Sequence, residues 1–272
     1  NEKIMRKPNE IFTHSIGSDA ANNIRDTENY TCEFTEKECT KKSRTIDYPM
    51  GVCSVEFGDN KPIICPNRFL EGQTVFRNIA NSAFGSIDNV LVFAEVKLKD
   101  VGNFDFVLVK HRPLSSKVED FCIVEFQSDA TTGTGKLVDA LTDFMGGNMG
   151  DNYAFGLNTY NTIKLSYIQM LMKGQVMESW NKKIFWVMQN YVFNNMTDRF
   201  NLDQMEFDNE KNTQYHIYDL DNLNNLTLVS TKSSSVENLI TAFSGQPVPS
   251  QEQFIQKLED KIKLSVNLSI NL

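Results

Sequence analysis

The sequence predicts an α/β fold, in which a mixed sheet is flanked by helices and preceded by a small N-terminal module. Three observations predict this fold. Apolar runs rich in Val, Ile and Phe follow one another in the middle of the chain, helical patterns then alternate with further strands, and four of the five cysteines fall in the first quarter. The 272 residues, with 19 Phe among them, are enough to bury a large core.

The expected elements can be given in chain order. Residues 1–66 look irregular apart from short strand-like pieces such as GVCSVEF, and the apolar spacing of 69–84 is typical of a helix. The remainder predicts three strands, two helices, a strand, a helix, a strand pair and a terminal helix, over 89–98, 104–111, 120–127, 131–144, 160–180, 182–189, 191–202, 214–233 and 250–264. This order favours an antiparallel meander followed by a helical crossover.

Four cysteines lie in a polar segment that has little apolar material for a core of its own. Their spacing is C-x6-C-x13-C-x11-C, formed by Cys32, Cys39, Cys53 and Cys65. Two disulfides or unrelated free thiols are the alternatives, but no signal peptide is visible and disulfides need an oxidising compartment. A tetrathiolate site explains the concentration better, because soft thiolates select zinc or iron. We therefore expect residues 1–68 to form a metal-binding module, with zinc and iron not distinguished by the spacing.

Charge and hydropathy set limits on the partners. The formal net charge of −8 argues against a protein that coats polyanions regardless of their sequence, but it leaves open an enzyme whose carboxylates bind metal beside nucleic acid. The basic cluster Lys110, His111 and Arg112 is a candidate phosphate contact, although a solvated cluster gives the same pattern. No apolar run approaches 18 residues, so we expect no membrane span and a cytoplasmic protein.

Acidic and amide residues interrupt the apolar strands of the middle region. Because side chains alternate across a strand, Asp105 shares a face with Val107, and Glu125 shares a face with Gln127. If the three strands are neighbours, these polar residues and Glu95 converge at one edge of the sheet. Converging carboxylates repel one another unless a cation neutralises them, and a hard divalent ion such as Mg²⁺ prefers oxygen ligands of this kind. The pattern suits phosphoryl transfer, although each carboxylate alone could be a solvated residue at a strand end.

Beyond this chemistry, the order Asp…Glu-x-Lys/Gln on consecutive strands resembles that of the PD-(D/E)xK nuclease superfamily. The segments AEVKL, GNFDFVLV and VEFQSDATTG are more closely similar to the NotI restriction endonuclease family, which also carries an N-terminal four-cysteine iron site. The resemblance spans roughly residues 32–200 and includes the cysteines. It implies a restriction-endonuclease-like mixed sheet flanked by helices.

The resemblance also implies an activity and its residues. We expect a homodimeric type II enzyme that cuts both strands of double-stranded DNA at a short palindrome and leaves 5′-phosphate ends. Asp105 and Glu125 would ligate Mg²⁺, Glu95 would contribute to the metal site, and Gln127 would complete the catalytic set. The cysteines would hold iron rather than zinc. Family precedent suggests a GC-rich site, and residues 69–272 would form the nuclease domain with C-terminal recognition and dimerisation elements.

Two positions depart from the superfamily pattern. Phe104 stands in place of the proline before Asp105, which affects only the preceding turn. Gln127 stands in place of lysine, so no ammonium is available there to orient or deprotonate a water. Either Lys97 or a second metal ion could substitute, and we expect the second ion. In the turn after the E-x-Q segment, the pair Thr131 and Thr132 is a candidate DNA contact.

Two other functions are compatible with the same residues. The first is a monomeric repair or nicking nuclease built on the same core, which would not cut both strands at one site. The second is a non-catalytic, metal-stapled scaffold that binds DNA, in which Asp105 and Glu125 would have no chemical role. Loss of cleavage on replacement of these carboxylates would exclude the scaffold.

Overall fold

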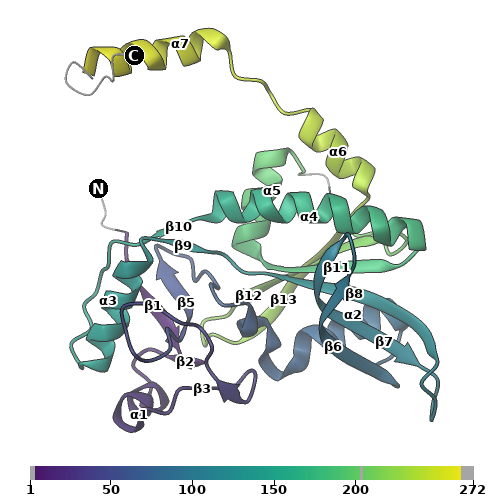
Figure 1. Cartoon of the computed structure of the whole chain (residues 1–272), viewed down its shortest axis with the longest axis horizontal. Coiled ribbons are helices and arrows are strands. Elements are labelled where there is room, and N and C mark those ends of the chain that lie inside the picture. The colour runs from purple at the N-terminus through teal and green to yellow at the C-terminus, as the bar shows by residue number, and fades with distance from the viewer. Residues whose placement is uncertain (1–3, 203–204, 265–272) are drawn as a thin grey trace.

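The centre of the structure is a six-stranded mixed sheet (Figure 1), seen in a computed structural model that describes residues 4–202 and 205–264. The strand order is β13-β12-β11-β8-β7-β6. Strands β6, β7 and β8 form an antiparallel meander, whereas β8, β11 and β12 run parallel. The predicted meander and crossover are therefore confirmed. The bounds are β6 (Val90–Leu98), β7 (Gly102–His111), β8 (Val118–Gln127), β11 (Lys183–Gln189), β12 (Thr213–Leu220) and β13 (Leu226–Ser234).

Helices cover both faces of this sheet (Figure 1). One face packs against α4 (Thr159–Trp180), α5 (Asn190–Phe200) and α6 (Val236–Ser244), and the other against the 3-10 helix η1 (Pro66–Gln73) and α2 (Thr74–Phe84). Along β8, Ile123 belongs to the core under α4, whereas Cys122 and Val124 belong to the core under α2. The alternation predicted for this strand is confirmed. In the described ranges, no helix is long and apolar enough to cross a membrane.

The N-terminal segment forms a smaller sheet of order β2-β1-β5. Its core also takes in Leu137, Leu141 and Phe144 of α3, so the core includes residues on both sides of position 68. The division of the chain at that position stays a prediction. The remaining bounds are β1 (Arg6–Ile11), β2 (His14–Ser15), α1 (Asp19–Thr27), β3 (Thr31–Cys32), β4 (Lys37–Glu38), β5 (Val52–Phe57), β9 (Thr131–Thr132), α3 (Thr134–Met145), β10 (Gly156–Leu157) and α7 (Gln251–Leu264).

Two stretches differ from the sequence prediction. The helix expected over 69–84 is two elements, because Glu71 leaves the helical region with ψ of 119° and Gly72 takes φ of 55°. Residues 1–66 are more regular than expected, since they contain β1 and α1. The start of α1 follows a capping signal that the prediction overlooked: the Ser18 side chain accepts a hydrogen bond from the backbone of Ala21.

A buried ion pair joins the N-terminal sheet to the rest of the molecule. The Arg68 side chain of η1 is 1% exposed and lies 3.0 Å from the carboxylate of Glu10 in β1. The same guanidinium contacts Glu71 at 3.0 Å and donates to the backbone carbonyl of Asn224 in the β12–β13 connection. Three segments far apart in the sequence therefore depend on one cation, and without it the Glu10 carboxylate would be buried with no charge to offset it.

We predict that Arg68→Ala lowers the free energy of unfolding by about 3–5 kcal/mol, because breaking a buried pair leaves an uncompensated charge. The matched control is Arg112→Ala. Its partner Glu119 is 3.5 Å away and both side chains are more than a third exposed, so the expected loss is within about 0.5 kcal/mol. Urea unfolding of the two variants and the parent measures both values, and equal losses would contradict the structural role given to Arg68.

Candidate functional site

The strand register places three acidic residues in one row across the sheet. In the β6–β7 pair, Ala94 lies opposite Phe106 and Val96 opposite Phe104, so Glu95 stands opposite Asp105. In the antiparallel β7–β8 pair, Phe106 lies opposite Val124. The same register extended by one residue places Asp105 opposite Glu125. The backbone register therefore puts the three acidic residues on neighbouring strands in one row, and their convergence with Gln127 into one site stays a prediction.

The outer member of the row has an unusual backbone. Glu95 is exposed on the edge strand β6, and its φ of 53° lies in the left-handed region that residues other than glycine rarely adopt. Such conformations are unfavourable by roughly 1–3 kcal/mol and gather at functional sites. In the middle of the row, an Asp105 oxygen accepts a hydrogen bond of 2.9 Å from the backbone N–H of Phe126, which fixes that side chain against β8.

The inner member of the row, Glu125, is a buried carboxylate. It is 3% exposed, and its Oε2 lies 2.7 Å from Nζ of Lys173. Its Oε1 has no hydrogen-bond partner within the described part of the chain. Burial raises the pKa of Glu125 to about 7, the Lys173 ammonium opposes this rise, and the nearby Asp105 adds to it. One oxygen of a desolvated carboxylate thus has no protein partner and suits a cation.

Lys173 is a site residue that the sequence analysis missed. It projects from α4, is 5% exposed, and also donates a 2.8 Å hydrogen bond to the backbone carbonyl of Asn103. A signal was present: Lys173 lies three residues after Met170 and four before Met177, which are both fully buried. A lysine at this spacing on the apolar face of a helix must meet a partner in the core.

Gln127 is held by the same helix. Its side-chain oxygen accepts a hydrogen bond from the hydroxyl of Ser166 in α4, and its amide nitrogen donates to the carbonyl of Ser128 at 3.0 Å. An amide can donate or accept hydrogen bonds but cannot take up a proton near neutral pH. Gln127 can therefore orient a neighbouring group without acting as its base.

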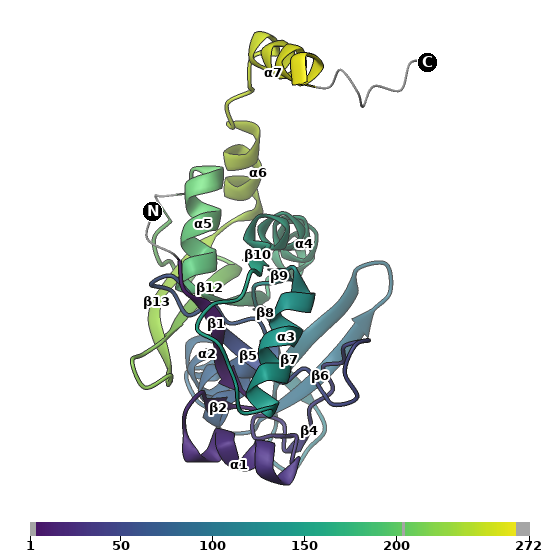
Figure 2. The same cartoon turned by 90° about the vertical axis from the view of Figure 1, so that its left-hand side faces the viewer.

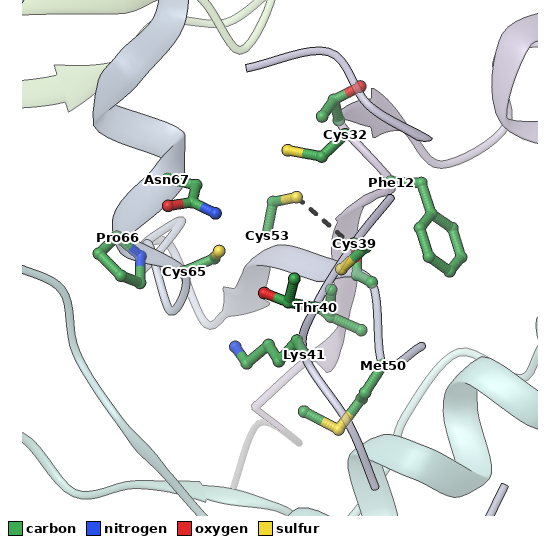
Figure 3. Close-up of a pocket in the computed structure, with 13 residues that line it drawn as sticks. Phe12, Cys32, Cys39, Thr40, Lys41, Met50, Cys53, Cys65, Pro66 and Asn67 are labelled. Atoms are coloured by element: carbon green, nitrogen blue, oxygen red, sulfur yellow. Dashed lines mark hydrogen bonds between the residues drawn. The ribbon is translucent and has the colours of Figure 1, made fainter. Parts of the chain in front are cut away.

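The four N-terminal cysteines line one cavity of about 260 Å³ (Figure 3). All four are free thiols in the structure. Burial raises the pKa of Cys39, Cys53 and Cys65 above that of an ordinary thiol, and thiol neighbours in the same group raise each of them further. Deprotonation of such a set needs a positive charge among the sulfurs, and a soft metal ion would supply it. The chemistry of the donor set therefore suits zinc or iron, although in the described residues the sulfurs are not gathered into a ready ligand group.

Comparison with known families decides the class of protein. The model of the family described as "Restriction endonuclease NotI" matches residues 21–229, a span that contains both the acidic row and the cysteines. The chain belongs to the NotI restriction endonuclease family. A search of curated proteins found no match. As a member of this family the protein is a restriction endonuclease, and hence a nuclease that binds and cuts DNA.

Restriction endonucleases typically use Mg²⁺. Among residues 4–202 and 205–264, no three His, Cys, Asp or Glu side chains are gathered closely enough to form a ready metal-ligand group. This holds for the acidic row and for the cysteines alike. The oxygens of the row still fit a hard cation, because the unpartnered Glu125 Oε1 lies next to Asp105 in the register. Their assignment as ligands stays a prediction for this NotI family member.

The candidate DNA-binding residues lie at two different places. Lys110, His111 and Arg112 are at the far end of the β7–β8 ladder, with Lys110 five residues or about 16 Å along the strand from Asp105. Local partners occupy them, since Lys110 donates to the Phe84 carbonyl and Arg112 pairs with Glu119. The pair Thr131 and Thr132 lies instead in β9, just beyond the β8 end that carries Gln127.

Proposed function

We propose that the protein is a type II restriction endonuclease that uses Mg²⁺ to cut both strands of double-stranded DNA at a short, GC-rich palindrome. It would leave 5′-phosphate ends and act in the cytoplasm of a bacterium or archaeon. The observation that supports this proposal most directly is the acidic row on three adjacent strands, with a buried carboxylate oxygen that has no partner in the described part of the molecule.

Each residue of the row has a role in this proposal. Asp105 and Glu125 would hold the metal ion, and Glu95 would complete the site from the solvent side. Bound Mg²⁺ would polarise the phosphodiester and lower the pKa of the attacking water. Gln127, fixed by Ser166, has one amide N–H left with which to orient a water or a phosphate oxygen. Thr131 and Thr132 lie at the same end of the sheet and are the better placed of the candidate DNA contacts.

We predict that the purified protein with Mg²⁺ cuts a long GC-balanced DNA into discrete bands, and that EDTA, Asp105→Asn and Glu125→Gln each abolish them. The neutral side chains keep the shape of the carboxylates but lose the charge that holds a divalent ion. Glu119→Ala is the matched control, since this glutamate lies on the same strand, is exposed, and should leave the bands unchanged.

The outcomes of this digestion separate the alternatives. Sequencing of the ends of discrete fragments gives the recognition site and the cut position. If the DNA is degraded to a smear and Glu125→Gln abolishes this degradation, the protein is a nuclease but does not cut at a defined site. No cleavage of varied DNAs by the folded, Mg²⁺-loaded protein would favour the non-catalytic scaffold.

The cysteine cavity supports a second part of the proposal, a structural iron site in the N-terminal module. We predict one iron per chain in the purified protein, measured by elemental mass spectrometry. Cys53→Ser should lose the metal, because an alcohol is a poor ligand for a soft ion. Cys122→Ser is the control, since Cys122 lies in the core under α2 and away from the cavity. If zinc is found in place of iron, the identity of the metal in this proposal is wrong but the site stands. If Cys53→Ser keeps the metal, the site itself is refuted.

The C-terminal arm supports a homodimer. In both views α7 lies away from the body of the molecule (Figures 1 and 2). Its apolar residues are exposed, with Phe254 at 62% and Ile262 at 72%. A helix of 14 residues is marginal in water on its own, so α7 needs a surface to cover its apolar side. Leu165, Ile168 and Met172 form an exposed apolar stripe of similar length on α4, which a second copy could offer.

We predict that the double substitution Phe254→Glu and Ile262→Glu converts the dimer to a monomer, because it places charge where apolar contacts would form. Light scattering after size exclusion measures the mass of each species. Lys257→Glu, also on α7 and exposed, is the control and should remain dimeric. A parent protein that is monomeric at micromolar concentration would refute the dimer and favour the monomeric nuclease.

A further inference from the structure

Lys173 is a buried lysine to which the proposed reaction gives no role. A lysine is almost never this deeply buried unless its charge is paired. Its Nζ lies 2.7 Å from Oε2 of Glu125 and 2.8 Å from the Asn103 carbonyl, so two of its three N–H groups have partners on β8 and β7. The ring of Phe104 also lies 5.4 Å from the ammonium, within the range of a favourable cation–π contact.

The pair leaves the two oxygens of Glu125 in different situations. Oε2 is held by the ammonium, whereas Oε1 is buried and has no partner in the described residues. Because the ion pair holds one oxygen of this carboxylate, the group cannot rotate freely. The other oxygen then stays at a fixed position beside Asp105. Precise placement matters in catalysis, because a displacement of about 1 Å can cost roughly 100-fold in rate.

No other cation in the described part of the chain has this relation to the row. None of the remaining ion pairs there involves Glu95, Asp105 or Glu125. Lys97, which the sequence offered as a substitute for the missing lysine, is exposed on the edge strand. Lys173 is also too deeply buried to meet a DNA phosphate directly, so its influence has to pass through the carboxylate that it contacts.

We propose that Lys173 is a positioning residue of the nuclease site: from α4 it holds Oε2 of Glu125 and thereby keeps Oε1 directed to the position of the catalytic cation. In this way it supplies the ammonium that Gln127 does not. The inference rests on the proposed function, since it assigns a part in the same reaction.

The first test compares two lysines of one helix. Lys173→Met keeps the length of the side chain and removes its charge, and it should lower kcat by at least about 100-fold. The dissociation constant for DNA should change by less than about threefold, because a buried lysine makes no phosphate contact. Lys164→Met is the matched control on the exposed side of α4 and should keep both values.

A purely structural lysine would give the same loss, so the decisive arm is a rescue. Gln127 shares a strand face with Glu125 and already contacts α4 through Ser166. A lysine introduced there should reach Glu125 from the same side. Gln127→Lys in the Lys173→Met background should therefore raise kcat at least about tenfold above that of Lys173→Met alone. A general folding defect would not be corrected by a second substitution on β8.

Thermal melting without Mg²⁺ or DNA tests the pair itself. Lys173→Met leaves the buried Glu125 carboxylate without any partner, and this should lower the melting temperature. Adding Glu125→Gln removes the unpaired charge, so the double variant should melt at least about 2 °C above Lys173→Met alone. Should Lys173→Met fail to fold, Lys173→Met combined with Gln127→Lys keeps the charge balance and carries the kinetic test.

The possible results fall into separate classes. If the parent protein cuts no DNA, the proposed nuclease fails as a whole. If the parent cuts and Lys173→Met cuts within about threefold of it, only the role of Lys173 is overturned. Loss of activity that Gln127→Lys does not recover in a folded, DNA-binding protein overturns it as well. Loss with recovery, together with the melting difference, establishes it.

Discussion

Negative charge on three neighbouring strands is the constraint on which the rest of this structure depends. The row runs from Glu95 in solvent, through Asp105, to the buried Glu125, and each member is accommodated differently. Water screens the first, a backbone N–H of β8 satisfies the second, and an ammonium from α4 balances the third. Exposure therefore falls along the row from the edge strand towards the helix.

The crossover helix α4 serves both the core and the site. Its apolar side packs on β11 and β12, which fixes where the helix lies. From that fixed position Ser166 reaches Gln127, and Lys173, two helical turns further on, reaches Glu125. A site built on a packed helix and three adjacent strands of one sheet is held more rigidly than one built on loops. The burial of α4 therefore contributes to the geometry of the acidic row as well as to stability.

The cysteine-rich segment is joined to the same sheet at several points. Arg68 ties it to β1 and to the β12–β13 connection. The Gln189 side chain at the end of β11 accepts from the Ile63 backbone at 2.7 Å and donates to the Lys61 carbonyl at 2.8 Å. The Ile63 carbonyl in turn accepts from the backbone of Asp129, two residues beyond Gln127. A metal ion among the cysteines would brace a segment that is hydrogen-bonded to the chain just beyond the end of β8.

The sequence by itself determined the meander, the crossover, the long helix and the face of β8 that carries Glu125 and Gln127, because strand alternation and helical spacing are local properties. It did not predict the break at Glu71 and Gly72. It also missed β1 and α1, because their apolar patterns are too short to be recognised. Only the tertiary structure placed Lys173 against Glu125. The two are far apart in the chain, and their contact depends on how α4 crosses the sheet. A lysine among the apolar positions of a helix indicates that a partner must exist, but packing decides which carboxylate that partner is.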